Sequence, residues 1–167
     1  MKRKASAKTA TAKPLPSRTT GPGESPGFLL WKVSNAWQRK QRAALQPLGL
    51  THSQFVILAA SAWFGATETL TQARVAQLTG IDVMTTSQVL RTLEAAQLLE
   101  RREHPDDPRA KTIGVTARGR ELAKKAIVVV EAVDAKFFEP IGARAAELIP
   151  LFTRLTETES TEPDGAE

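Results

Sequence analysis

The chain has 167 residues, of which 41% are hydrophobic, and this is enough apolar surface for one compact domain but not for two. It contains no cysteine, which excludes disulfide frameworks, thiolate metal sites and thiol-based redox sensing. The formal net charge is +5, but residues 1–26 carry six Lys or Arg against one acid, whereas residues 156–167 carry five acids and no base. The body between them is also net positive, which suits a polyanionic partner.

Both ends of the chain are predicted to lack a fold of their own. Residues 1–26 are rich in Lys, Ala, Thr, Ser, Pro and Gly, so we predict a disordered basic arm, which either contacts phosphates loosely or is a solvated tail without a role. Residues 156–167 are predicted to be an acidic disordered tail. No apolar run approaches the roughly 20 residues of a membrane-spanning helix, and the N-terminus has no apolar signal core. We therefore expect a cytoplasmic, nucleoid-associated protein with no membrane partner.

The ordered part is expected to begin with two helices. Leu30, Val33 and Trp37 recur at helical spacing, which predicts a first helix over about residues 28–46 that ends before a proline. Thr51 and Gln54 then have the form of a capping box, in which each residue bonds to the backbone of the other. A second helix should therefore start after Thr51 and run to about residue 63.

Two short helices with a Gly-containing turn between them should follow. Thr71 can cap the first, in which Val75 and Leu78 are expected to face the core, and Gly80 belongs to the turn. Asp82 can cap the second, predicted over residues 82–96. One face of that helix carries Val83, Thr86, Leu90 and Leu93. Helices joined in this way are typical of a helix-turn-helix.

A β-hairpin is predicted directly after these helices. Residues 98–102 can form its first strand, and the prolines and aspartates between His104 and Pro108 favour a turn. The second strand leads to Thr116, which can cap the next helix. A β-hairpin directly after a helix-turn-helix is typical of a DNA-binding wing.

Two apolar helices should close the ordered part. The first is expected to end at Pro140, and the second, over residues 141–155, to kink at Pro150. Together with the first helix of the chain, they present more apolar surface than a small winged helix has to cover. The surplus indicates an interface between two copies of the chain.

The pattern from residue 71 to residue 116 resembles the winged helix-turn-helix of the MarR (multiple antibiotic resistance regulator) family, whose wing carries Asp-x-Arg and then Leu-Thr. Asp107 and Arg109 match the first pair, and Val115-Thr116 stands in for the second. The resemblance implies a mainly α fold with a small β-hairpin wing (α+β). It also implies one domain over residues 27–155, with a DNA-binding lobe at about 51–116 and dimerisation helices at about 28–46 and 117–155. Two departures are Gln97, where the family usually has Gly, and Pro108, which stiffens the wing tip.

The resemblance implies a homodimeric, sequence-specific transcriptional regulator, a repressor rather than an activator, that binds a pseudo-palindromic operator in double-stranded DNA. The recognition helix 82–96 is expected in the major groove. Arg109 is expected in the minor groove, oriented by Asp107, the alternative being an incidental surface ion pair. The expected base-reading residues are Met84, Thr85, Ser87, Gln88 and Arg91. The expected phosphate contacts beside the wing are Arg101, Arg102, Lys111, Arg118 and Arg120.

The aromatic residues of the first two helices have two interpretations, which are packing of the core and dimer, or an effector cleft. Proteins similar to this one often bind a small aromatic or phenolic anion, for which the candidates are Trp37, Arg39, His52 and Phe55. No Ser-His-Asp order, phosphate loop or metal-ligand spacing is present, so we expect no enzyme activity, metal or cofactor. Two alternatives remain for the function: a non-specific, chromatin-like DNA-binding protein driven by the basic arm, and a helical ligand-binding or protein-interaction module without DNA binding.

Overall fold

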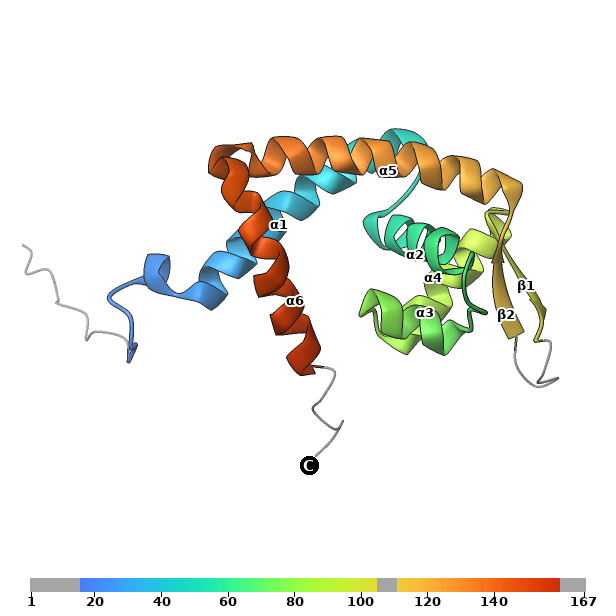
Figure 1. Cartoon of the computed structure of the whole chain (residues 1–167), viewed down its shortest axis with the longest axis horizontal. Helices are drawn as coiled ribbons and strands as arrows, with labels where there is room; N and C mark the ends of the chain where they lie inside the picture. Colours follow the sequence, from blue (N-terminus) through green and yellow to red (C-terminus); the bar gives the residue numbers. More distant parts are fainter. Residues whose placement is uncertain (1–15, 105–110, 160–167) are drawn as a thin grey trace, which may run out of the picture. The chain divides into compact units, whose positions relative to one another are not determined.

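The computed structural model describes residues 16–104 and 111–159 (Figure 1). The chain divides into two compact units, residues 1–35 and 36–167. Helix α1 (Pro26–Leu45) crosses the boundary between the units; a short 3₁₀ helix, η1 (Pro22–Glu24), precedes it and another, η2 (Gln46–Leu48), follows it. The first unit therefore contains a helical turn at Pro22–Glu24, inside the segment for which we predicted a disordered arm.

The second unit contains the helices and the hairpin expected from the sequence. Its helices α2 (His52–Phe64), α3 (Gln72–Thr79) and α4 (Val83–Ala95) form one lobe with strands β1 (Leu99–Glu103) and β2 (Lys111–Val115). Figure 1 shows α5 (Ala117–Phe138) starting at the hairpin and running along α2, with which it is in contact. A 3₁₀ segment, η3 (Glu139–Glu147), and α6 (Leu148–Glu159) complete the described chain. The predicted fold class, mainly α with a small hairpin, is confirmed.

The core of this lobe is aliphatic and draws on helices α1 to α5 and on both strands. Its buried residues come from the end of α1, the middle of α2, one face each of α3 and α4, both strands and α5 as far as Val130. Leu50, Leu70 and Leu98 of the connecting segments complete it. Its largest fully buried apolar side chains are Leu45, Ile57, Leu58, Leu70, Val75, Leu90 and Leu93. Burial of such side chains contributes roughly 1.5–3 kcal/mol each, so this shared core holds α4 and the hairpin in one arrangement. None of the helices in the described ranges is long and apolar enough to cross a membrane.

The predicted helix caps at Thr51, Thr71, Asp82 and Thr116 are all confirmed. Thr51 and Gln54 form the reciprocal capping box at the start of α2. The hydroxyl of Thr71 accepts a hydrogen bond from the backbone N–H of Arg74 at 3.2 Å, and Asp82 accepts one from that of Thr85 at 2.8 Å. These bonds satisfy amides that have no partner inside their helices, so each cap fixes the residue at which its helix begins.

Gln97 takes the left-handed conformation that ends α4, with φ 59°. The N–H of Leu98 donates to the carbonyl of Leu93 at 2.9 Å and the N–H of Gln97 to that of Glu94 at 2.8 Å, which is the Schellman pattern of helix termination. The hydroxyl of Thr116 lies 2.8 Å from the carbonyl of Gln97, to which it donates. Gln97 therefore keeps the backbone geometry that favours glycine, and the start of α5 is tied to the end of α4.

Two details of the predicted helices were wrong. Val83 does not share the buried face of Thr86, Leu90 and Leu93, because it lies in the first turn of α4, beyond the edge of the core, and is 55% exposed. The last helix begins at Leu148 rather than residue 141, because Gly142 has φ 53° and interrupts the helix. Pro150 thus lies in the first turn of α6, where its missing N–H costs no hydrogen bond and no kink follows. Residues 156–159, predicted as part of the tail, belong to α6.

Candidate nucleic-acid interface

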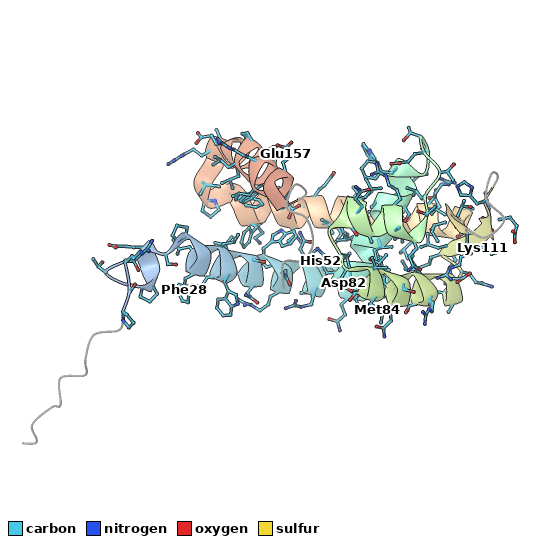
Figure 2. The ribbon with its side chains drawn as sticks, turned by 90° about the horizontal axis from the view of Figure 1, so that it is seen from below. Phe28, His52, Asp82, Met84, Lys111 and Glu157 are labelled. Carbon is cyan, nitrogen blue, oxygen red and sulfur yellow. The ribbon has the colours of Figure 1, made fainter. Side chains whose placement is uncertain are left out.

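Helix α4 presents a continuous outward face opposite its buried one. Met84, Thr85, Gln88 and Arg91 are all exposed, and Ser87 is half-buried. The guanidinium of Arg91 donates to the hydroxyl of Ser87 at 3.1 Å, so these two candidates act as a pair rather than independently. Figure 2 shows Asp82 and Met84 near one another at one edge of the second unit. The predicted base-reading residues thus lie together on the accessible side of a capped helix.

Asp82 places a negative charge at the first turn of α4. The backbone N–H of Thr85 and then the Thr85 side chain donate to its carboxylate, and these bonds lower the pKa of Asp82. The charge complements the positive end of the helix dipole. It also repels DNA phosphates, so this end of α4 is better suited to the base edges than to the backbone.

The hairpin is anchored to the helix-turn-helix through the segment before α3. The N–H of Ile113 donates to the carbonyl of Leu70 at 2.8 Å, and Thr71 forms an isolated bridge with Thr112. Because Thr71 is also the cap of α3, the second strand and the helix-turn-helix share a backbone connection. The hairpin base therefore has a fixed position relative to α3 and α4.

The strand register separates the basic residues of the hairpin onto two faces. Arg101 pairs with Ile113 and Arg102 with Thr112, so their side chains point to opposite faces of the two-stranded sheet. Arg101 forms an ion pair with Glu94 of α4 at 3.5 Å, whereas Arg102 pairs with Glu100 on its own strand. Arg101 and Arg102, both predicted phosphate contacts, therefore lie on opposite faces of the hairpin, and their contacts with DNA stay predictions.

Lys111 lies on the same hairpin and forms an ion pair with Glu103. Each basic residue on the described strands thus has an acidic neighbour, and a phosphate would have to replace it. Exposed ion pairs of this kind contribute only about 0–1 kcal/mol, so replacing the carboxylate by a phosphate costs little free energy. Of the remaining predicted phosphate contacts, Arg118 and Arg120 are exposed near the start of α5. Asp107 and Arg109 lie outside the described residues, and their roles stay predictions.

A second cluster joins three of the four predicted effector residues. The ring of His52 packs edge-on against Trp37 with centroids 4.9 Å apart and stacks on Phe55 at 6.4 Å. Among the described residues, none of the contacts that hold this cluster together involves the fourth candidate, Arg39, which is exposed on α1. The structure thus supports an aromatic cluster of Trp37, His52 and Phe55.

Two polar residues of this cluster were missed by the sequence analysis. One carboxylate oxygen of Asp134 accepts from the indole N–H of Trp37 at 2.6 Å and from the side-chain amide of Gln41 at 2.7 Å. Gln41 is fully buried, and its Oε1 atom has no hydrogen-bond partner in the described part of the chain. A signal was present, because Gln41 follows Trp37 by one helical turn and Asp134 interrupts the apolar stripe of α5.

The environment of His52 favours its neutral form. Burial lowers the pKa of His52, and the positive charge of Arg42 lowers it further, whereas the carboxylate of Asp134 acts in the opposite direction. A neutral imidazole packed between two aromatic rings makes the wall of this cluster apolar. The carboxylate of Asp134 is a charged group within this cluster, hydrogen-bonded to Trp37 and Gln41.

Comparison with known proteins places the helix-turn-helix and wing in one family. The family model described as MarR family matches residues 48–110, which include α2, α3, α4 and β1. The chain is 41% identical over 123 residues to the uncharacterized HTH-type transcriptional regulator YdcH of Bacillus subtilis, covering 73% of this chain and 84% of the relative.

Two further relatives connect the sequence to solved structures. The HTH-type transcriptional repressor Rv2887 of Mycobacterium tuberculosis is 36% identical, covering 70% of this chain and 82% of the relative. Its complex with salicylic acid superposes with a TM-score of 0.59 and 33% identity, covering 80% of this chain and 95% of that one. CouR of Rhodococcus jostii, solved with p-coumaroyl-CoA, gives a TM-score of 0.68 at 26% identity, covering 89% and 100%. With these relatives across most of its length, the chain belongs to the MarR family of DNA-binding transcriptional regulators rather than to a family of enzymes.

Proposed function

We propose that this protein is a homodimeric repressor that binds a pseudo-palindromic operator, with one α4 helix in each of two successive major grooves. The observation that carries the proposal is the capped α4 helix, which buries Thr86, Leu90 and Leu93 and leaves the opposite face free for base contacts. Half-sites on a duplex would then be about 34 Å apart, one helical turn. The relatives named as repressors support this sign of regulation.

The wing would supply a second contact beside the recognition helix. The described base of the hairpin is fixed to the segment before α3 by backbone contacts. We propose that Arg109 enters an A·T-rich minor groove, where negative potential is focused, and that Asp107 orients it. Lys111 and the arginines near the hairpin would position the protein on phosphates.

Exposed apolar faces in both units support the dimer. In the first unit, α1 exposes Phe28, Leu29, Leu30, Trp31 and Val33. In the second unit, α6 exposes Ile149, Leu151, Phe152 and Leu155. Contiguous apolar surface on a soluble domain marks an interface, and an isologous dimer would cover these faces with their copies.

The aromatic cluster supports a second part of the proposal, in which the protein releases DNA when a small aromatic acid binds to it. Salicylic acid is the ligand of the Rv2887 structure, and CouR carries a coumaroyl thioester. The aromatic ring of a ligand could pack against Trp37, His52 and Phe55 in place of their contacts with one another. The Oε1 atom of Gln41, which has no partner in the described part of the chain, could accept a hydrogen bond from a ligand hydroxyl. The ligand would act by binding one spacing of the two DNA-binding lobes better than the other, since only differential affinity shifts an equilibrium.

Selection of bound genomic fragments followed by footprinting tests the proposal. A homodimeric repressor should protect two half-sites related by two-fold symmetry near a promoter, and Arg109→Ala should weaken binding to the selected site far more than to random duplex. Removal of residues 1–26 should mainly reduce the dependence of affinity on salt. Protection without two-fold symmetry would contradict the dimer, and equal losses of Arg109→Ala on both DNAs would contradict the role of the wing.

A further inference from the structure

The N-terminal end of α4 exposes two adjacent apolar side chains. Val83 is 55% exposed and Met84 is 82% exposed, and they are the exposed large apolar side chains of α4. We propose that Val83 and Met84 read thymine through its 5-methyl group, which makes this end of α4 select A·T base pairs at fixed positions. The inference rests on the proposed function, because it assumes that α4 lies in the major groove.

Packing within the chain does not account for this pair. Thr86, one turn further along α4, is fully buried, and its hydroxyl donates to the carbonyl of Ile81 at 3.2 Å. Val83 precedes it on the same side of the helix but lies past the edge of the core. Met84 points away from the protein body, as Figure 2 shows. Both side chains therefore have apolar surface to bury against a partner outside the lobe.

Major-groove chemistry identifies the partner. Thymine presents a methyl group in the major groove and cytosine does not, and apolar side chains contact that methyl while polar ones pair with base donors and acceptors. The first residues of a recognition helix are those that reach the base edges. Methionine is unbranched and adapts its shape, so it can follow a methyl group without fixed geometry.

The neighbouring polar residues agree with a preference for A·T pairs. Gln88 lies one turn after Met84 on the same exposed face, and a glutamine amide forms two hydrogen bonds with adenine. Met84 and Gln88 would then read thymine and adenine on nearby base pairs. The carboxylate of Asp82, held by the N–H of Thr85, keeps phosphates away from the same end of the helix.

Uracil-substituted DNA isolates the methyl group. The probe is the tightest-binding 30-base-pair duplex from the genomic selection. It is synthesised once with its thymines and once with uracil in place of every thymine. Uracil keeps every hydrogen bond of thymine and lacks only the methyl. Loss of one buried methyl should weaken binding about fourfold, and one contact in each half-site should weaken the dimer about sixteenfold.

Variants assign the effect to the two residues. In Met84→Ala the ratio of the two dissociation constants should fall from about sixteen towards one, and Val83→Ala should lower it in part. Val128→Ala is the matched control, because Val128 is 67% exposed on α5 and is changed in the same way, and it should keep the wild-type ratio.

The outcomes separate the two proposals. Equal affinity of the wild-type protein for the thymine and uracil duplexes would overturn thymine reading and leave the regulator proposal standing. An unchanged ratio in both Met84→Ala and Val83→Ala would also overturn it. Failure to recover any duplex that binds better than random DNA would overturn the proposed function itself.

Discussion

Replacing Gly119 with alanine is expected to destabilise the domain through a backbone clash at the junction of hairpin and α5. A Cβ atom at this position would lie 2.0 Å from the carbonyl oxygen of Leu98 and 3.0 Å from a methyl of Val115. The Leu98 carbonyl cannot retreat freely, because it accepts from the N–H of Thr116 at 3.2 Å, and the N–H of Leu98 donates to Leu93. The clash must therefore move one of two anchored backbone segments by about 1 Å.

The magnitude follows from two opposing effects of the Gly119→Ala change. Overpacking in a rigid core costs about 1–3 kcal/mol, and the upper end applies here because both colliding segments are backbone. Alanine regains at most about 1 kcal/mol over glycine inside a helix. The free energy of unfolding should thus fall by about 2 kcal/mol, which for a domain of this size lowers Tm by about 4–8 °C.

Thermal unfolding followed by circular dichroism measures this change, with both proteins at one concentration, since the proposed dimer would make Tm depend on concentration. Gly27→Ala is the matched control, since Gly27 is also a helical glycine but has no atom within 4 Å of the added Cβ. The control should unfold at or above the wild-type temperature. A Tm for Gly119→Ala that equals that of the wild type would refute the contact between α5 and the hairpin.

Three further changes test separate features. Gln97→Gly should raise the free energy of unfolding in urea by about 1 kcal/mol, because glycine adopts φ 59° without strain, and no gain would argue against that backbone geometry. Ser61→Ala should stabilise by about 1 kcal/mol, since the buried Ser61 hydroxyl has no partner in the described part of the chain, and a loss in the same assay would reveal one. The lowered pKa of His52 means that the unfolded chain takes up the proton first, so stability should fall as pH decreases from about 6.5 through the lower folded value. His52→Gln should flatten this slope between pH 7 and pH 5, and an unchanged slope would exclude His52 as its source.

The order and ends of the helices in the DNA-binding lobe were determined by local sequence. The caps at Thr51, Thr71, Asp82 and Thr116 were all predicted, because each consists of one side chain and an amide three residues later. The hairpin strands were predicted for a similar reason, since alternation and turn residues act over a few positions. The same proximity in sequence makes these elements independent of how the rest of the chain packs.

Tertiary structure decided where the buried faces end and which distant residues meet. Val83 matches the apolar pattern of α4 but extends past the core, and Arg101 pairs with Glu94 of α4, whereas Arg102 pairs within its own strand. Asp134 meets Trp37 across 97 positions in the chain, a separation at which no sequence pattern fixes the pairing. Burial and long-range hydrogen bonds depend on which element packs against a residue. A single sequence does not specify the distance or orientation of that element.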